Sequence, residues 1–163
     1  MKIGDLITFS YPAVHKQGTR AHDKNPTVLI LHPTWGGTMH GLNFNYLQPD
    51  EINMVRMILS PKFQLHHKAA LTRNNPNIVK EFDRIIGEAG NATITSPRDF
   101  YNRAIRPFIS TRGWDPYRRY RSDKMTNVRI LEPYAVMSGD KELSLFKKFS
   151  QKFSPMRGPT IRR

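Results

Sequence analysis

The chain has 163 residues and a formal net charge of +13, from 26 Lys and Arg against 13 Asp and Glu. Its length suits one domain with a modest core, and because it has no cysteine, disulfide bonds and thiolate zinc sites are excluded. Residues 1–60 hold five basic and four acidic side chains, so nearly all of the excess charge lies after them. This asymmetry favours a polyanion or an acidic protein as partner, with a merely solvating basic surface as the alternative.

The N-terminal stretch MKIGDLITFSYP alternates polar and apolar residues and lacks the continuous apolar run of a signal peptide. No stretch approaches the ~18 apolar residues that cross a bilayer. We therefore expect a protein that is made and used in a cytoplasm and has no membrane partner.

Two strands are predicted first. In GDLITFSY, Ile7, Phe9 and Tyr11 alternate with Thr8 and Ser10, which is the period of a strand. After a polar loop, TVLILHP has four consecutive apolar residues, which indicates a strand covered on both faces.

The stretch HPTWGGTMHGLNFNYL predicts a strand, a turn at Gly36-Gly37 and a second strand, because glycine tolerates the positive φ of tight hairpin turns. A phosphate-binding loop would need a helix after the glycines. His32 and His40 are expected to be cross-strand neighbours rather than metal ligands, because the stretch contains no third ligand.

The strand after the turn has an alternating pattern of its own. We expect Leu42, Phe44 and Tyr46 to face the core, and Asn43 and Asn45 to face away from it.

Helix-start signals follow, in which proline stands at the head of an apolar stripe, usually after a capping residue. They occur at Pro49, Asn75-Pro76, Ser96-Pro97 and Asp115-Pro116. The whole pattern predicts helices over residues 49–59, 62–72, 76–87, 97–109 and 116–122, and strands over residues 4–11, 27–32, 40–47 and 126–131.

This order of elements predicts the α+β class, with a small curved or barrel-like β-sheet and a helical insertion before the last strand. Residues 1–137 are assigned to this domain. Residues 138–163 are predicted to form a basic, amphipathic C-terminal arm, extended from the domain and ordered on binding.

Enzyme signatures are missing from the sequence. It has no Walker loop, no H-E-x-x-H, no G-x-S-x-G and no Rossmann glycine pattern, and its carboxylates are scattered. Adjacent His66 and His67 would point about 100° apart on a helix. We therefore predict no catalytic residues, no metal, no cofactor and no small-molecule substrate.

The segment Arg98–Arg129 is the main positive signal, with nine basic and three acidic side chains interleaved with aromatic residues. Arginine binds phosphate bidentately and aromatic rings stack on bases, but Arg and Tyr also anchor protein interfaces. We predict partner binding by this segment and by the arm, through Arg112, Trp114, Tyr117, Arg118, Arg119, Tyr120, Arg121, Phe146, Phe149, Phe153, Arg157, Arg162 and Arg163.

The stretches GDLITFSY, NPTVLILHP, HGLNFNYL and YRRYRSDKMTNVRIL resemble a family of small virion proteins of contractile-tailed bacteriophages, over about residues 3–134. The resemblance implies a structural component of the tail or baseplate, found in the virion after assembly in the host cytoplasm, with no catalytic residues. Its expected partners are other virion proteins in a multi-subunit assembly. A nucleic-acid-binding module that contacts phosphates through Arg98–Arg129 is the alternative.

Overall fold

The computed structural model describes residues 1–2, 4–12, 24–59, 68–69, 72–109 and 115–132. The predicted domain over residues 1–137 stays a prediction, and the described residues group into two compact units. The sheet unit contains the described residues among 1–48 and 115–132, and the helical unit contains those among 49–109. The predicted arm, residues 138–163, lies outside the described residues, as does most of the predicted helix over residues 62–72.

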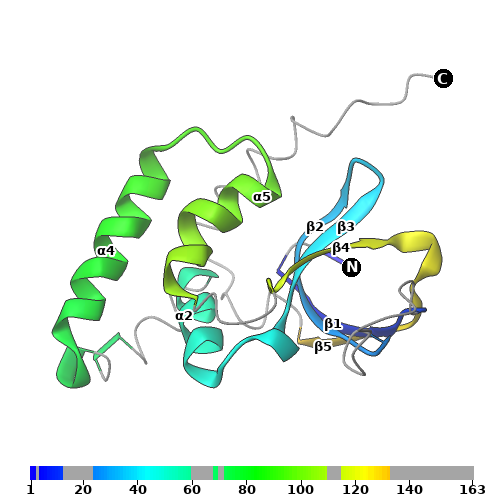
Figure 1. Ribbon diagram of the computed structural model, residues 1–163, viewed down its shortest axis with the longest axis horizontal. Helices are drawn as coiled ribbons and strands as arrows, with labels where there is room; N and C mark the ends of the chain where they lie inside the picture. The colour runs from blue at the N-terminus through cyan, green and yellow to red at the C-terminus, as the bar shows by residue number, and fades with distance from the viewer. Residues whose placement is uncertain (3, 13–23, 60–67, 70–71, 110–114, 133–163) are drawn as a thin grey trace. The chain divides into compact units, whose positions relative to one another are not determined.

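The sheet unit is built on five antiparallel strands, drawn in Figure 1. They are β1 (Leu6–Ser10), β2 (Thr27–Trp35), β3 (Thr38–Asn43), β4 (Tyr117–Arg121) and β5 (Thr126–Glu132). Their order is β4-β3-β2-β1-β5, so β4 and β5 are the two edges and the sheet is not closed into a barrel. The α+β class is confirmed, but the helical segment precedes the last two strands rather than only the last one.

The β2–β3 hairpin has the predicted form. Gly36 and Gly37 have φ values of 60° and 84°, in the left-handed region that glycine adopts without strain. In the register, His32 lies opposite His40, so the prediction of cross-strand neighbours is confirmed.

The predicted strand over residues 40–47 ends earlier, at Asn43, and a short 3-10 helix η1 (Phe44–Tyr46) follows. The Asn43 side chain causes the change of direction by accepting a hydrogen bond of 3.0 Å from the N–H of Asn45. Asn43 is fully buried and its Nδ2 donates to the Tyr120 hydroxyl at 3.4 Å. The prediction that Asn43 faces away from the core is therefore wrong.

The predicted helix over residues 116–122 is also wrong, because this segment is strand β4. The Asp115-Pro116 pair resembles a helix start, but Asp115 Oδ1 accepts the N–H of Tyr117 at 3.0 Å within a turn. The carbonyl of Pro116 then accepts the N–H of Asn43 and starts the pairing with β3. Pairing with β3 overrides the local helix signal.

One face of the sheet carries a closely packed core, whose members are Ile7, Phe9, Val28, Ile30, Met39 and Tyr120. Their positions alternate along β1 and β2, as side chains on one face of a strand must, and Met39 of β3 and Tyr120 of β4 complete the cluster. The Phe9 ring meets the Tyr120 ring edge-on at 5.0 Å between centroids and the Tyr11 ring at 6.2 Å. These contacts hold β1 and edge strand β4 together although the two strands are not paired.

The helical unit contains α2 (Pro49–Leu59), α4 (Pro76–Asn91) and α5 (Pro97–Phe100). A π-helical turn η2 (Tyr101–Ile105) and a 3-10 turn η3 (Arg106–Phe108) continue α5. The predicted caps are present, since the Asn75 side chain accepts the N–H of Ile78 and the Ser96 side chain accepts that of Asp99. Among the helices of the described residues, none is long and apolar enough to cross a membrane.

Candidate binding surface on the arginine strand

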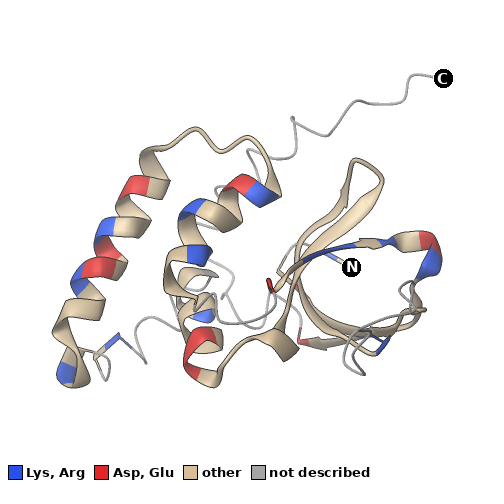
Figure 2. Ribbon diagram, viewed as in Figure 1, with Lys and Arg blue, Asp and Glu red and all other residues tan. Residues whose placement is uncertain are grey.

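Strand β4 has the sequence Tyr-Arg-Arg-Tyr-Arg and forms one edge of the sheet. Figure 2 shows its basic residues along the strand and at the turn that follows it. Both tyrosines are only 5% exposed, whereas Arg119 and Arg121 are exposed and Arg118 is intermediate. We call the exposed arginine-bearing edge of β4 the arginine strand.

The two tyrosines attach β4 to β3 through buried hydrogen bonds. The Tyr117 hydroxyl is hydrogen-bonded to Nδ1 of His40, and the Tyr120 hydroxyl accepts from Asn43. Their predicted role in binding a partner stays a prediction, and in this structure the two rings are buried. The surface that β4 presents is therefore made by its arginines.

The ring of His40 lies in a buried polar cluster. Its Nε2 is 3.1 Å from the Trp35 carbonyl oxygen and 3.0 Å from Thr38 Oγ1. A carbonyl can only accept, so Nε2 carries the proton and Nδ1 accepts from the Tyr117 hydroxyl. Burial lowers the pKa of His40 to about 4, with smaller contributions in the same direction from the charges of Arg119 and His32, against the opposing hydrogen bond to Trp35.

This pKa predicts a pH dependence of stability. Between pH 6.5, the ordinary histidine value, and pH 4, the unfolded chain binds a proton that the folded chain excludes. Stability should therefore fall as pH decreases through this range and level off below it, by about 1–2 kcal/mol after allowance for partial solvent screening. Urea unfolding of the wild type and His40→Gln at pH 7, 5.5 and 4 checks this, because the wild type should lose its advantage over the variant. Parallel pH profiles would exclude His40 as the cause.

The three arginines of β4 have different surroundings. The Arg118 guanidinium lies 4.9 Å from the ring centroid of Tyr46, and its Nε is buried without a hydrogen-bond partner among the described residues. Arg121 forms a bidentate pair with Asp123, with Nε–Oδ1 at 3.2 Å and Nη2–Oδ2 at 2.9 Å. Arg119 forms no ion pair within the described part of the chain. Among the described residues, Arg119 is thus the arginine of this strand that is exposed and has no ion-pair partner.

The backbone of β4 is partly closed to further strands. The N–H of Asn43 donates to the carbonyl of Pro116. In an antiparallel ladder alternate residues pair with the neighbouring strand, so the backbone N–H and C=O groups of Tyr117, Arg119 and Arg121 point away from β3. The N–H of Tyr117 is taken by Asp115 and that of Arg121 by the Tyr11 hydroxyl at 3.2 Å. Strand β4 therefore presents side-chain charge to a partner more readily than a free backbone edge.

The predicted basic segment Arg98–Arg129 is divided between the two units. Three of its arginines belong to the helical unit, where Arg98 lies over the Tyr101 ring at 5.6 Å and Arg103 pairs with Asp99 at 2.9 Å. The other described basic residues of the segment belong to the sheet unit: Arg118, Arg119, Arg121, Lys124 and Arg129.

Eight of the predicted partner-binding residues lie outside the described residues. They are Arg112, Trp114, Phe146, Phe149, Phe153, Arg157, Arg162 and Arg163. Their predicted role stays a prediction.

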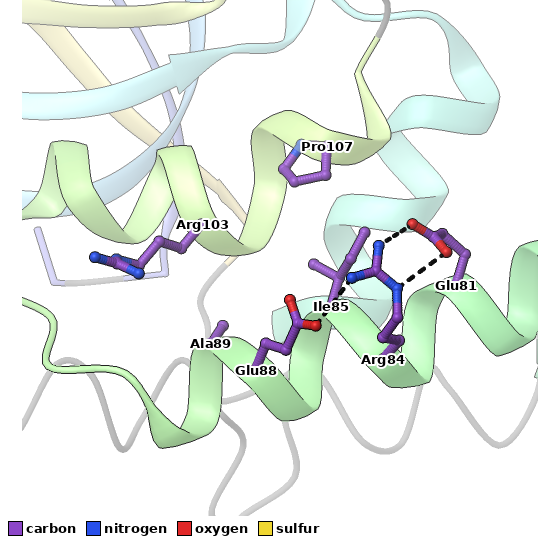
Figure 3. A pocket seen from close by; sticks show the side chains of 7 residues that line it. All are labelled: Glu81, Arg84, Ile85, Glu88, Ala89, Arg103 and Pro107. Carbon is purple, nitrogen blue, oxygen red and sulfur yellow. Dashed lines mark hydrogen bonds and ion pairs between the residues drawn. The ribbon is translucent and has the colours of Figure 1, made fainter.

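The helical unit has a shallow pocket of about 300 Å³, shown in Figure 3. Arg84 lies between Glu81 and Glu88 and pairs with both, which raises its pKa and lowers that of Glu81. Arg103, at the opposite wall, is paired with Asp99. Both arginine side chains of the pocket thus form ion pairs with carboxylates. Among the described residues, no cluster of three or more His, Asp or Glu is arranged to hold a metal ion.

Sequence reasoning missed one feature, the exposed apolar residues of β5. Val128, Ile130 and Leu131 are 39%, 49% and 52% exposed. The available signal was the run Val-Arg-Ile-Leu, which places apolar residues on both faces of a predicted strand.

Comparison with known proteins gives no relative from which a role could be transferred. No protein-family model, no curated protein and no solved structure matches this chain.

Proposed function

We propose that this chain is a non-enzymatic structural component of a bacteriophage tail or baseplate, which binds neighbouring virion proteins through the arginine strand and the C-terminal arm. The proposal places it in the virion, within a multi-subunit assembly. The sequence resemblance supports the tail or baseplate; the physical support comes from β4.

The observation that carries the proposal is an exposed row of arginine side chains on a backbone fixed by buried contacts. Tyr117 and Tyr120 are buried with bonded hydroxyls, so the strand needs little ordering when a partner binds. Arginine is enriched at protein interfaces and forms planar paired contacts with carboxylates. A neighbour with an acidic surface fits this arrangement.

A charge reversal tests the proposal in phage particles. The double variant Arg119→Glu, Arg121→Glu should enter purified particles at least tenfold less than the wild type, because both exposed contacts to an acidic neighbour become repulsive. Lys80→Glu is the matched control, since Lys80 is exposed on α4 in the helical unit. Both proteins should melt near the wild-type temperature. Normal incorporation of the double variant would contradict the proposed role of the arginine strand.

Nucleic acid is the second candidate partner, favoured by the guanidinium of Arg118 over the ring of Tyr46 beside two exposed arginines. The logarithm of the association constant for duplex DNA would then fall linearly with the logarithm of the salt concentration, with a slope of about −0.9 for each phosphate contact. Fluorescence anisotropy with a labelled duplex gives this slope. A slope that is shallower by about 2 in the double variant would favour the nucleic-acid alternative, and an unchanged slope would count against it.

A further inference from the structure

The two edge strands of the sheet differ in the contacts that their residues already make. On β4, the N–H groups of Tyr117 and Arg121 already have partners within the sheet unit. On β5, residues 126–131 are all exposed, and Arg129 forms no ion pair among the described residues. An edge strand with exposed apolar side chains is a template for pairing with another extended segment.

The register shows which side chains such a segment would meet. Ile130 lies opposite Ile7, and Arg129 lies opposite Thr8. Residues opposite each other in a ladder share a face, so Ile130 and Val128 extend the face that holds buried Ile7. The apolar core of the sheet thus continues onto β5 as an exposed row, with Arg129 and Leu131 on the other face.

Strand β5 carries two charged side chains, Arg129 and Glu132 at its end, and Arg129 forms no ion pair among the described residues. Arg129 itself is exposed. A segment that pairs here meets Val128 and Ile130 on one face, and Arg129 beside Leu131 on the other.

From these observations we propose that β5 is the docking site for an acidic, extended segment of a partner protein, which adds to the sheet as a sixth strand. Its apolar residues pack beside Val128 and Ile130, and its carboxylates face Arg129. The inference rests on the proposed function as an assembly protein and names a second contact, separate from the arginine strand.

A second copy of this chain fits the edge less well. If β5 pairs with β5 of a second copy, the two-fold axis that relates the copies is perpendicular to the sheet, and each side chain keeps its face. Because directly opposite residues share a face, the axis must pass beside one residue that lies opposite its own copy. Centring on residue 128 or 130 places the two Arg129 side chains diagonally adjacent, and centring on Arg129 places them directly opposite. Like charges at these positions disfavour pairing, whereas an acidic strand is attracted.

The test uses the full chain, labelled with ¹⁵N, and two synthetic peptides of nine residues. One alternates valine with glutamate, and the other alternates valine with lysine. We expect the acidic peptide to bind at least tenfold more tightly, with amide shifts concentrated at Asn127–Glu132. Arg129→Glu should reverse this preference, Ile130→Asn should weaken binding of the acidic peptide, and Lys80→Glu should change neither.

Three results would overturn the inference: shifts that map to β4, equal affinity for the two peptides, or no shifts at millimolar peptide. A concentration-dependent dimer with amide protection at β5 would also overturn it, by identifying a second copy as the occupant. Particle incorporation of the Arg119→Glu, Arg121→Glu variant is measured separately. Failure of the β5 inference is therefore distinguishable from failure of the proposed function.

Discussion

Replacing Gly41 with alanine is expected to lower the free energy of unfolding by about 3 kcal/mol, at the upper end of what overpacking usually costs. Gly41 lies in β3 between Ile30 of β2 and Arg118 of β4. A Cβ at this position would stand 2.3 Å from Cγ1 of Val28 and 2.7 Å from the carbonyl oxygen of Leu29. The carbonyl belongs to the backbone of the central strand, so it cannot move without disturbing the sheet.

Gly87 is the matched control. It lies in α4, and a Cβ added there has no atom within 4 Å. Gly87→Ala should stabilise the protein by about 0.5–1 kcal/mol, because alanine is the better helix former. Urea denaturation of both variants measures the two effects. A Gly41→Ala variant within about 1 kcal/mol of the wild type would show that β2 and β3 separate easily, contrary to this packing.

Truncating Phe9 to alanine should cost about 3–5 kcal/mol, the usual range for a buried phenylalanine. Phe9 is 2% exposed, and its ring contacts the edges of both Tyr120 and Tyr11. Its loss removes buried area and the aromatic contact that joins β1 to edge strand β4.

The comparison for this variant is Val128→Ala, on the same sheet but 39% exposed. It should cost less than about 1 kcal/mol, because little apolar area returns to water. Thermal and urea unfolding distinguish the two variants. If Phe9→Ala and Val128→Ala had similar effects, Phe9 would not be buried in the core as the structure places it.

The hairpin, β1 and the capped helices could be predicted because their signals are local. Gly36-Gly37 determines the turn, alternation determines the face of Phe9, and Asn75 and Ser96 cap the helices they precede. The pairing of His32 with His40 then follows from the position of the turn.

The errors arose where a distant strand decides the structure. Asp115-Pro116 has a local helix signal, but pairing with β3 makes the segment a strand. Asn43 is polar in an alternating pattern, yet it is buried because its amide donates to Tyr120, 77 positions away in sequence. These partners belong to another part of the chain and have no local signature.

The candidate site was predicted in part for the same reason. The sequence pointed to Arg118, Arg119 and Arg121, whose charge is visible in composition, and it grouped them with Tyr117 and Tyr120. The register with β3 places the two tyrosines on opposite faces of the sheet, where both are buried, so the exposed arginines form the surface. The exposure of Ile130 likewise depends on β5 being an edge.

The most direct test of the account is photocrosslinking inside assembled particles. A photoreactive amino acid at Ser122, exposed and adjacent to the arginine strand, reports what lies against β4, and the same group at exposed Asn77 on α4 serves as control. The account predicts a crosslink from position 122 to another virion protein, lost in the Arg119→Glu, Arg121→Glu variant. A crosslink from position 122 to packaged DNA, or equal yields from positions 122 and 77, would contradict it.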